Sequence, residues 1–394
     1  MKNKDIFSIL GIFSVLLLLV ACNNSSGGGV GGSGIINRGT ISDFGSIVVN
    51  GTDFDTSEAS LIVDGQTLGV GDAVVLANLD IGRVVTVIGS EGDGEETAIA
   101  ERVYYSDEVS GPVISVTAID PGTKELAVMG QTVIINALTQ FKTSDFDTIV
   151  PNDVVEVSGY YDDMGTVWAT FVDKIGEFTP GLVYEVKGFI QSLDTAQHTF
   201  LINGLRVDYS DPDVILPSEP LENGLLVEAE GIVDDTGLNM FAQSISIEDD
   251  IGAENADEVE VTGFVTAVVS TDEFTVGTQD VVVEAGAIFV DGTQADIVLG
   301  VKLEAEGTLE DGILVADEIE FWLPDQIELE GELTELISQY EFTVEDQAVS
   351  TTNETVWEDG GPEDLMLGIN IEIKGRMQAD VLVADKVSFE LADD

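Results

Sequence analysis

The sequence predicts an all-β protein made of five tandem small antiparallel barrels, OB-like and of about 70 residues each. Apolar and polar residues alternate over short stretches, and helical periodicity is nearly absent after residue 22. One line, "LEAEGTLEDGILVADEIEFW" at 303–322, returns as "IEIKGRMQADVLVADKVSFE" at 371–390. The alternative is a five-bladed propeller-like ring, but the unequal linkers favour separate barrels strung along the chain.

A glycine inside a strand marks each copy of this line. These repeat glycines are Gly89, Gly159, Gly231, Gly307 and Gly375. In the fourth copy Leu303 and Ala305 alternate with glutamates before Gly307, which predicts a half-buried strand that bends at the glycine. A small residue follows nine to eleven positions later, at Ala100, Ala169, Ala242, Ala316 and Ala384. Apart from Lys174, apolar residues then come three and five positions after each alanine, and this change of parity predicts a β-bulge just after it.

Other positions recur in every copy. A turn former stands seven residues before each repeat glycine, at Gly82, Asn152, Gly224, Gly300 and Gly368, and predicts a left-handed backbone there. An apolar residue precedes it by three positions, at Leu79, Ile149, Leu221, Ile297 and Leu365. Each copy opens on a further glycine, at Gly39, Gly111, Gly188, Gly263 and Gly331.

The fourth copy shows the expected strand layout. Its strands are predicted near 259–269, 272–277, 280–284, 301–309 and 312–322. One-turn helices are expected only in the loops near 142–150 and 361–367. The repeat boundaries that follow are 35–108, 109–183, 184–257, 258–325 and 326–394.

The first residues have the features of an export signal. A basic head is followed by the uncharged apolar run 6–20 and then by "LVAC" at 19–22. This ending resembles the lipobox of bacterial lipoproteins, which implies a signal peptide at 1–21, cleavage between Ala21 and Cys22, and a palmitate-type lipid anchor on Cys22. Cys22 is the only cysteine, which excludes a disulfide within the chain. Residues 22–34 then form a Gly/Ser-rich tether.

The repeated unit resembles a tandem-repeat family of bacterial lipoproteins classed as a domain of unknown function. The similarity is carried by "GTISDFGSIVVNGTDFDTSEASLIVDG" (39–65), "GPVISVTAIDPGTKELAVMGQTVIINALTQF" (111–141) and "VEVSGYYDDMGTVWAT" (155–170). It extends over 35–391, with the first two copies expected to match best and the last two to depart furthest. The resemblance implies a lipid-anchored β protein of the cell envelope and supplies no catalytic residues. Asn23 stands where many Gram-negative lipoproteins retained at the inner membrane have Asp, so the similarity to lipoproteins implies the outer membrane if the host is Gram-negative.

The charge of the chain limits its partners. A formal net charge of −61 excludes nucleic acid, whose binding needs clustered Lys and Arg, and leaves the lipid anchor as the membrane contact. We interpret the acidity as a solvated surface and expect no cofactor. The alternative is Ca²⁺ bound at acidic turns, with Asp53, Asp55, Asp93, Asp211 and Asp213 as candidate ligands, although neither EF-hand nor RTX spacing occurs.

Candidate chemistry is sparse. His198 is the only histidine, which excludes a zinc site and a Cys/His nucleophile pair, and no GxSxG elbow occurs. We therefore expect no catalytic residues. A stacking platform for a neutral glycan is a further hypothesis, with Trp168, Trp322, Trp357, Tyr104, Tyr105, Tyr160 and Tyr161 as its candidate residues. Tyr105 and Phe321 occupy one repeated position, so we expect those two to pack in a core.

These observations favour a non-catalytic, lipid-anchored envelope protein that acts as a repeat scaffold or as a binding module for an envelope protein or glycan. A divalent-cation-dependent structural or adhesive protein is the first alternative. A polysaccharide-active enzyme is the second.

Overall fold

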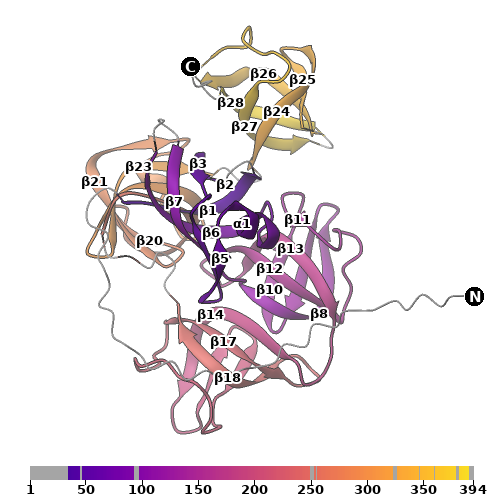
Figure 1. Ribbon diagram of the computed structural model, residues 1–394, viewed down its shortest axis with the longest axis vertical. Coiled ribbons are helices and arrows are strands. Elements are labelled where there is room, and N and C mark those ends of the chain that lie inside the picture. The colour runs from indigo at the N-terminus through magenta and orange to yellow at the C-terminus, as the bar shows by residue number, and fades with distance from the viewer. Residues whose placement is uncertain are drawn as a thin grey trace, which may run out of the picture.

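The computed structural model describes residues 34–44, 47–92, 97–248, 253, 255–322, 326–345, 347–358, 360–378 and 381–389 (Figure 1). The predicted signal peptide, its cleavage site and Cys22 lie outside these residues. The regular secondary structure of the described chain is almost entirely strand, as expected, with one α-helix and one 3-10 turn. Over these ranges no helix is long and apolar enough to cross a membrane.

The strands fall into consecutive segments, which we name by their order in the chain. The first segment contains β1 (Gly34–Phe44), β2 (Ile47–Val49), β3 (Thr52–Asp55), β4 (Ser60–Val63), β5 (Gln66–Val70), α1 (Asp72–Asn78), β6 (Val84–Glu91) and β7 (Thr97–Tyr105). The second contains β8 (Val109–Asp120), β9 (Thr123–Val128), β10 (Gln131–Ile135), β11 (Gln140–Phe141), β12 (Asp153–Tyr161) and β13 (Val167–Glu177). The third contains β14 (Val183–Asp194), β15 (Thr199–Ile202), β16 (Leu205–Asp208), β17 (Leu226–Val233) and β18 (Asn239–Ile247).

Two segments complete the chain. The fourth contains β19 (Ala256–Ser270), β20 (Glu273–Val276), β21 (Gln279–Val290), η1 (Gln294–Asp296), β22 (Lys302–Glu310) and β23 (Ile313–Phe321). The fifth contains β24 (Gln326–Ser338), β25 (Glu341–Val344), β26 (Gln347–Glu358), β27 (Asn370–Gln378) and β28 (Val381–Phe389). The fourth-segment strands follow the predicted layout, except that β21 extends to Val290. It pairs with β23 in two stretches, which are separated by a register shift between Val283 and Ile288.

The strands of a segment pair in a cyclic order. In the fifth segment β24, β25, β26, β28 and β27 form a closed barrel, in which the first and fourth strands pair and the third and fifth run parallel. The pairs β19–β20, β20–β21, β21–β23, β23–β22 and β22–β19 repeat that order in the fourth segment. This strand order is that of a small five-stranded barrel, because every edge strand finds a partner inside its own segment.

The predicted bulge is confirmed at the repeat glycines. Gly307 pairs with Ala316, while the preceding Glu306 pairs with Glu318, so the residue just after the alanine is left without a partner. The same register shift occurs at Gly89, Gly159, Gly231 and Gly375. A Cβ on Gly307 would lie 2.0 Å from the carbonyl oxygen of Val315, so close backbone approach across the bulge requires glycine.

The turn prediction is also confirmed, whereas the helix prediction is wrong. The predicted turn formers Gly82, Asn152, Gly224, Gly300 and Gly368 have φ values of 93°, 75°, 90°, 76° and 84°. Residues 142–150 and 361–367 form only hydrogen-bonded turns, such as Thr148 N to Asp145 O. The helix lies instead at Asp72–Asn78, where the run "DAVVLAN" packs Val75 into the core of the first segment.

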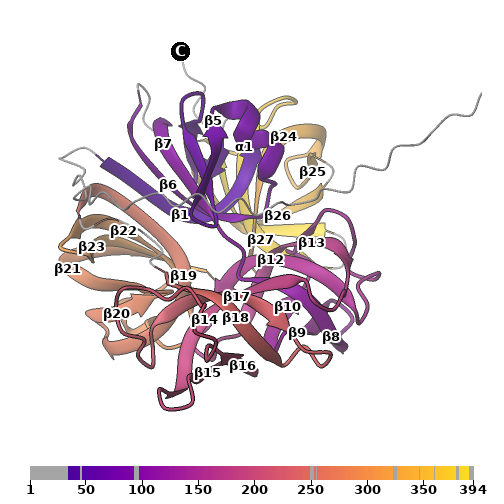
Figure 2. The same cartoon turned by 60° about the horizontal axis from the view of Figure 1, so that its bottom comes forward.

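The segments are packed together rather than strung out. Ile35–Arg38 of β1 pair in parallel with Glu258–Val261 of β19, which joins the first segment to the fourth. Val109 and Ser110 of β8 pair with Val186 and Glu185 of β14, and the second and third segments share one apolar core. Figure 2 shows the first four segments around a common centre. The predicted string of separate barrels is therefore wrong, and the cyclic pairing within segments does not match propeller blades.

The fifth segment makes fewer contacts with the rest. It has its own apolar core, and it projects from the other four in Figure 1. Ser42 donates a hydrogen bond of 3.0 Å to Glu330, and Lys374 Nζ lies 2.6 Å from Glu320 Oε1. These two contacts link the fifth segment to the first and fourth.

Candidate functional site

A cavity of about 620 Å³ lies between the second and fourth segments. Its size is within the range of small-molecule sites. Five aromatic side chains line it: Tyr160 from β12, Trp168 from β13, Phe264 from β19, Phe321 from β23, and Trp322. Asn136, Asp291, Asp296 and Lys302 add polar groups. We call this space the aromatic cavity.

Trp168 is the most open of the rings. It is 37 % exposed, and its ring centroid lies 5.9 Å from that of Phe264 at a 39° tilt. Its indole Nε1 donates to Asp162 Oδ2 at 3.1 Å. Asp162 is itself fixed, because its Oδ1 accepts the backbone N–H groups of Met164 and Thr166. The hairpin between β12 and β13 therefore holds the indole in one orientation.

Lys302 covers a second aromatic ring. Its Nζ lies 3.8 Å from the ring centroid of Trp322 and 4.9 Å from that of Tyr160, both within the range of cation–π attraction. Tyr160 is anchored from behind by a 2.9 Å hydrogen bond between its hydroxyl and Thr40 Oγ1. Trp322 Nε1 is buried and has no acceptor among the described residues.

Acidic and amide groups complete the lining. Burial, followed by the charge of Glu320, raises the pKa of Asp291, and Lys386 and Lys374 oppose that rise. Asp296 caps the η1 turn, where its Oδ2 accepts the backbone N–H of Thr293 at 2.9 Å. Asn136 Oδ1 accepts the N–H of Leu138 at 2.9 Å. These oxygens give the cavity acceptors on both sides of the segment boundary.

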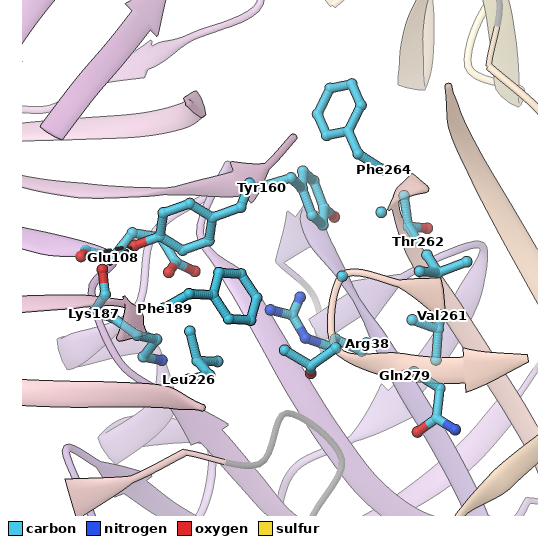
Figure 3. Close-up of a pocket in the computed structure, with 15 residues that line it drawn as sticks. Arg38, Glu108, Tyr160, Lys187, Phe189, Leu226, Val261, Thr262, Phe264 and Gln279 are labelled. Carbon is cyan, nitrogen blue, oxygen red and sulfur yellow. Dashed lines mark hydrogen bonds between the residues drawn. The ribbon is translucent and has the colours of Figure 1, made fainter. Parts of the chain in front are cut away.

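A smaller central cavity borders the aromatic one. It has about 20 Å³, room for one water molecule, and residues from the first four segments line it. Figure 3 shows Tyr160 and Phe264 among its lining residues, together with Arg38, Glu108 and Lys187. Tyr160 and Phe264 also line the aromatic cavity, so the two cavities share these rings.

A second large cavity, of about 520 Å³, lies between the first and third segments. Asp64 and Glu228 line it, and carboxylate oxygens of Asp64, Glu185 and Glu228 lie within 4.8 Å of one another. Burial first, and neighbouring carboxylates next, raise the pKa of Glu185 to about 10. Burial also raises the pKa of Glu228 to about 7 and that of Asp64 to about 6, with Lys187 opposing both. Near neutral pH Glu185 therefore retains its proton, Glu228 is partly protonated and Asp64 is mostly ionised.

A buried charge network joins the first and second segments. Arg83 is 4 % exposed and bonds to the Tyr105 hydroxyl, and its guanidinium lies 3.5 Å from both Asp107 Oδ1 and Glu156 Oε2. Burial lowers the pKa of Arg83, but the surrounding Tyr105 and acidic groups outweigh it and raise the pKa overall. Burial raises the pKa of Asp107 well above its usual range, and Arg83 opposes that rise.

The residues predicted as calcium ligands are not gathered by the described structure. Asp53 and Asp55 lie on exposed positions of β3, and Asp55 accepts the N–H of Ser57. Asp211 and Asp213 are exposed, and Asp211 Oδ1 accepts the N–H of Asp213 at 2.9 Å. Asp93 lies outside the described residues. His198 sits at an exposed turn with φ 55°, edge-on to Tyr209.

The predicted aromatic platform forms only in part. The structure brings Tyr160, Trp168 and Trp322 together and leaves Tyr104, Tyr105, Tyr161 and Trp357 outside the aromatic cavity. Tyr105 and Phe321 are buried core residues as predicted, and Phe321 also reaches the cavity. Sequence reasoning missed Phe264, Lys302 and Asp291. The sequence signal that could have found the first two is their place in the repeat, because Phe264 follows the opening Gly263 and Lys302 follows the turn at Gly300.

One protein family matches the chain in three places. The domain of unknown function DUF5666 covers residues 111–173, 262–320 and 330–388. Three stretches of the chain are therefore similar to the DUF5666 domain. The three matches begin at or beside the opening glycines Gly111, Gly263 and Gly331. They include the fourth and fifth segments, so the expectation that those depart furthest from the family pattern is wrong. No curated protein matches the chain.

Proposed function

We propose that this chain is a non-catalytic, lipid-anchored protein of the bacterial cell envelope that binds an envelope partner in the aromatic cavity. The aromatic cavity carries the proposal, because a concave site with open rings and a few fixed polar groups is the usual form of a ligand site. Acylation at Cys22 supplies the anchor, in the outer membrane of a Gram-negative host. The Gly/Ser-rich run after Cys22 would link this anchor to β1, so that the cavity meets material close to the membrane.

The architecture that we propose is five OB-like repeats of about 70 residues. Support comes from the recurrence of one pairing order, in which the first strand pairs with the second and fourth and the third runs parallel to the fifth. This order occurs in the first segment through β1, β2, β3, β7 and β6. It also occurs in the second and third segments. Because the cavity lies between segments, the repeats act as a scaffold for it.

Cosedimentation with isolated cell envelopes tests this function. The mature chain from residue 22, with Cys22→Ser to remove the anchor, is mixed with washed envelopes of the host and centrifuged. We expect binding that Leu138→Trp abolishes, because Leu138 lines the aromatic cavity and is 36 % exposed. Leu336→Trp is the matched control, since Leu336 is 37 % exposed on the fifth segment outside the cavity. Equal binding by both variants would overturn the proposal.

The cation alternative has one supporting observation, the carboxylates of Asp64, Glu185 and Glu228. It predicts that millimolar CaCl₂ raises the melting temperature above that in NaCl of equal ionic strength. A Ca²⁺-specific rise that Glu185→Gln removes would favour the alternative over the binding module. Identical melting curves in the two salts would reject the cation alternative and support the interpretation of the acidic residues as a solvated surface.

A further inference from the structure

We infer that the aromatic cavity binds a neutral oligosaccharide, with a sugar ring stacked on Trp168 and sugar hydroxyls bonded to Asp291, Asp296 and Asn136. This inference rests on the proposed function and names the chemical class of its ligand. It follows from the ring surface that the cavity presents, from the polar groups that surround it, and from the charge of the site.

The ring surface suits a sugar. The indole of Trp168 is held by its N–H bond to Asp162, which leaves its face partly exposed beside Phe264. An aromatic face is electron-rich, and the C–H groups on one side of a pyranose ring carry the complementary positive edge. Because the indole is already fixed, stacking a sugar on it costs little side-chain entropy.

The polar groups suit hydroxyls. An ionised carboxylate accepts hydrogen bonds only, whereas a sugar hydroxyl both donates and accepts, so Asp291 and Asp296 each match a ligand donor. Bonds from a hydroxyl to a carboxylate are charge-assisted and short. On the other wall the amide of Asn136 offers both a donor and an acceptor.

The charge of the site decides between ligand classes. A lipid or other apolar ligand would take the carboxyl groups of Asp291 and Asp296 out of water without replacing their hydrogen bonds, which is costly. A polyanion would meet these carboxylates and a chain of net charge −61, while the nearby Lys302 ammonium lies against Trp322 and Tyr160. A neutral polyhydroxylated ligand avoids both penalties.

Calorimetric titration with defined soluble oligosaccharides tests the inference. The probes are neutral hexoside oligomers, neutral N-acetylhexosamine oligomers and a uronic acid oligomer. We expect a neutral oligomer to bind and Trp168→Ala to weaken it about tenfold or more, as for removal of one stacking ring. Trp168→Phe should recover part of the affinity. Trp357→Ala is the control, because Trp357 stacks on Phe389 in the fifth segment, away from the cavity. Preference for the uronic acid oligomer would overturn the inference.

The envelope assay separates failure of this inference from failure of the proposed function. Envelopes are pretreated with periodate, which cleaves sugar diols, or with proteinase K, which removes protein. We expect periodate to abolish cosedimentation that depends on Leu138, and proteinase K to leave it intact. The reverse result would reject the oligosaccharide and retain the binding module. Binding that is absent, or that Leu138→Trp does not change, would reject both.

Discussion

Replacing Gly307 by alanine tests the close approach across the bulges. The new Cβ would lie 2.0 Å from Val315 O and 2.8 Å from Ala316 Cα. Strands β22 and β23 must therefore separate by about 1 Å, which is more than a packed interior absorbs. Overpacking costs about 1–3 kcal/mol. Losing a ladder hydrogen bond beside the bulge adds about 1 kcal/mol. We expect local stability in the fourth segment to fall by about 2–4 kcal/mol.

Hydrogen exchange measured by mass spectrometry reports this loss where it occurs. Amides of β22 and β23 should exchange about 30- to 700-fold faster in the variant, since each 1.4 kcal/mol is tenfold in an equilibrium constant. Gly176→Ala is the matched control, because a Cβ on this β13 glycine meets no atom within 4 Å. The bulge argument fails if the two alanine variants exchange alike, or if the loss is spread evenly over the segments.

Three further outcomes are expected. The pKa values of Asp64, Glu228 and Glu185 are raised to about 6, 7 and 10, so the stability that these groups contribute is complete below about pH 4 and is lost progressively as pH rises through those values. The free energy of unfolding in urea should therefore be higher at pH 5 than at pH 9, and this difference should be smaller in Glu185→Gln. Arg83→Met should lower the free energy of unfolding by about 3–5 kcal/mol, because it leaves Asp107 and Glu156 without their positively charged partner. A loss as small as the roughly 0–1 kcal/mol expected for a surface ion pair would contradict this. Cys22→Ser should abolish incorporation of labelled palmitate, and label retained by the variant would refute the lipobox interpretation.

Local features of the fold could be predicted because each depends on residues that lie close together in the sequence. A parity change after Ala316 requires a bulge, and a turn former at Gly300 predicts positive φ. Helix α1 was not predicted because "DAVVLAN" contains β-branched residues that favour strands. Its first-turn residue Asp72 accepts a hydrogen bond from Thr56, sixteen residues away, which the local sequence does not reveal.

The packing of segments against one another could not be predicted in the same way. Val259 and Val261 look like residues of any half-buried strand, and nothing in their alternation shows that they pair with β1. The aromatic cavity depends on this packing, because Trp168 and Phe264 come from different segments. Composition could therefore identify the aromatic residues as candidates, whereas their meeting point required the structure.

The parallel pairing of β1 with β19 also has a consequence for the order in which the protein folds. Asn37 bonds to Glu260 at 2.8 Å across 223 positions of sequence. Contacts so distant form late, because the chain must close a long loop before they can stabilise anything. During synthesis from the amino end, β1 emerges well before its partner strand. Until residues 258–261 arrive, one side of β1 is an open strand edge. The nascent protein is thus most exposed to aggregation, and most dependent on chaperones, in the interval between these two strands.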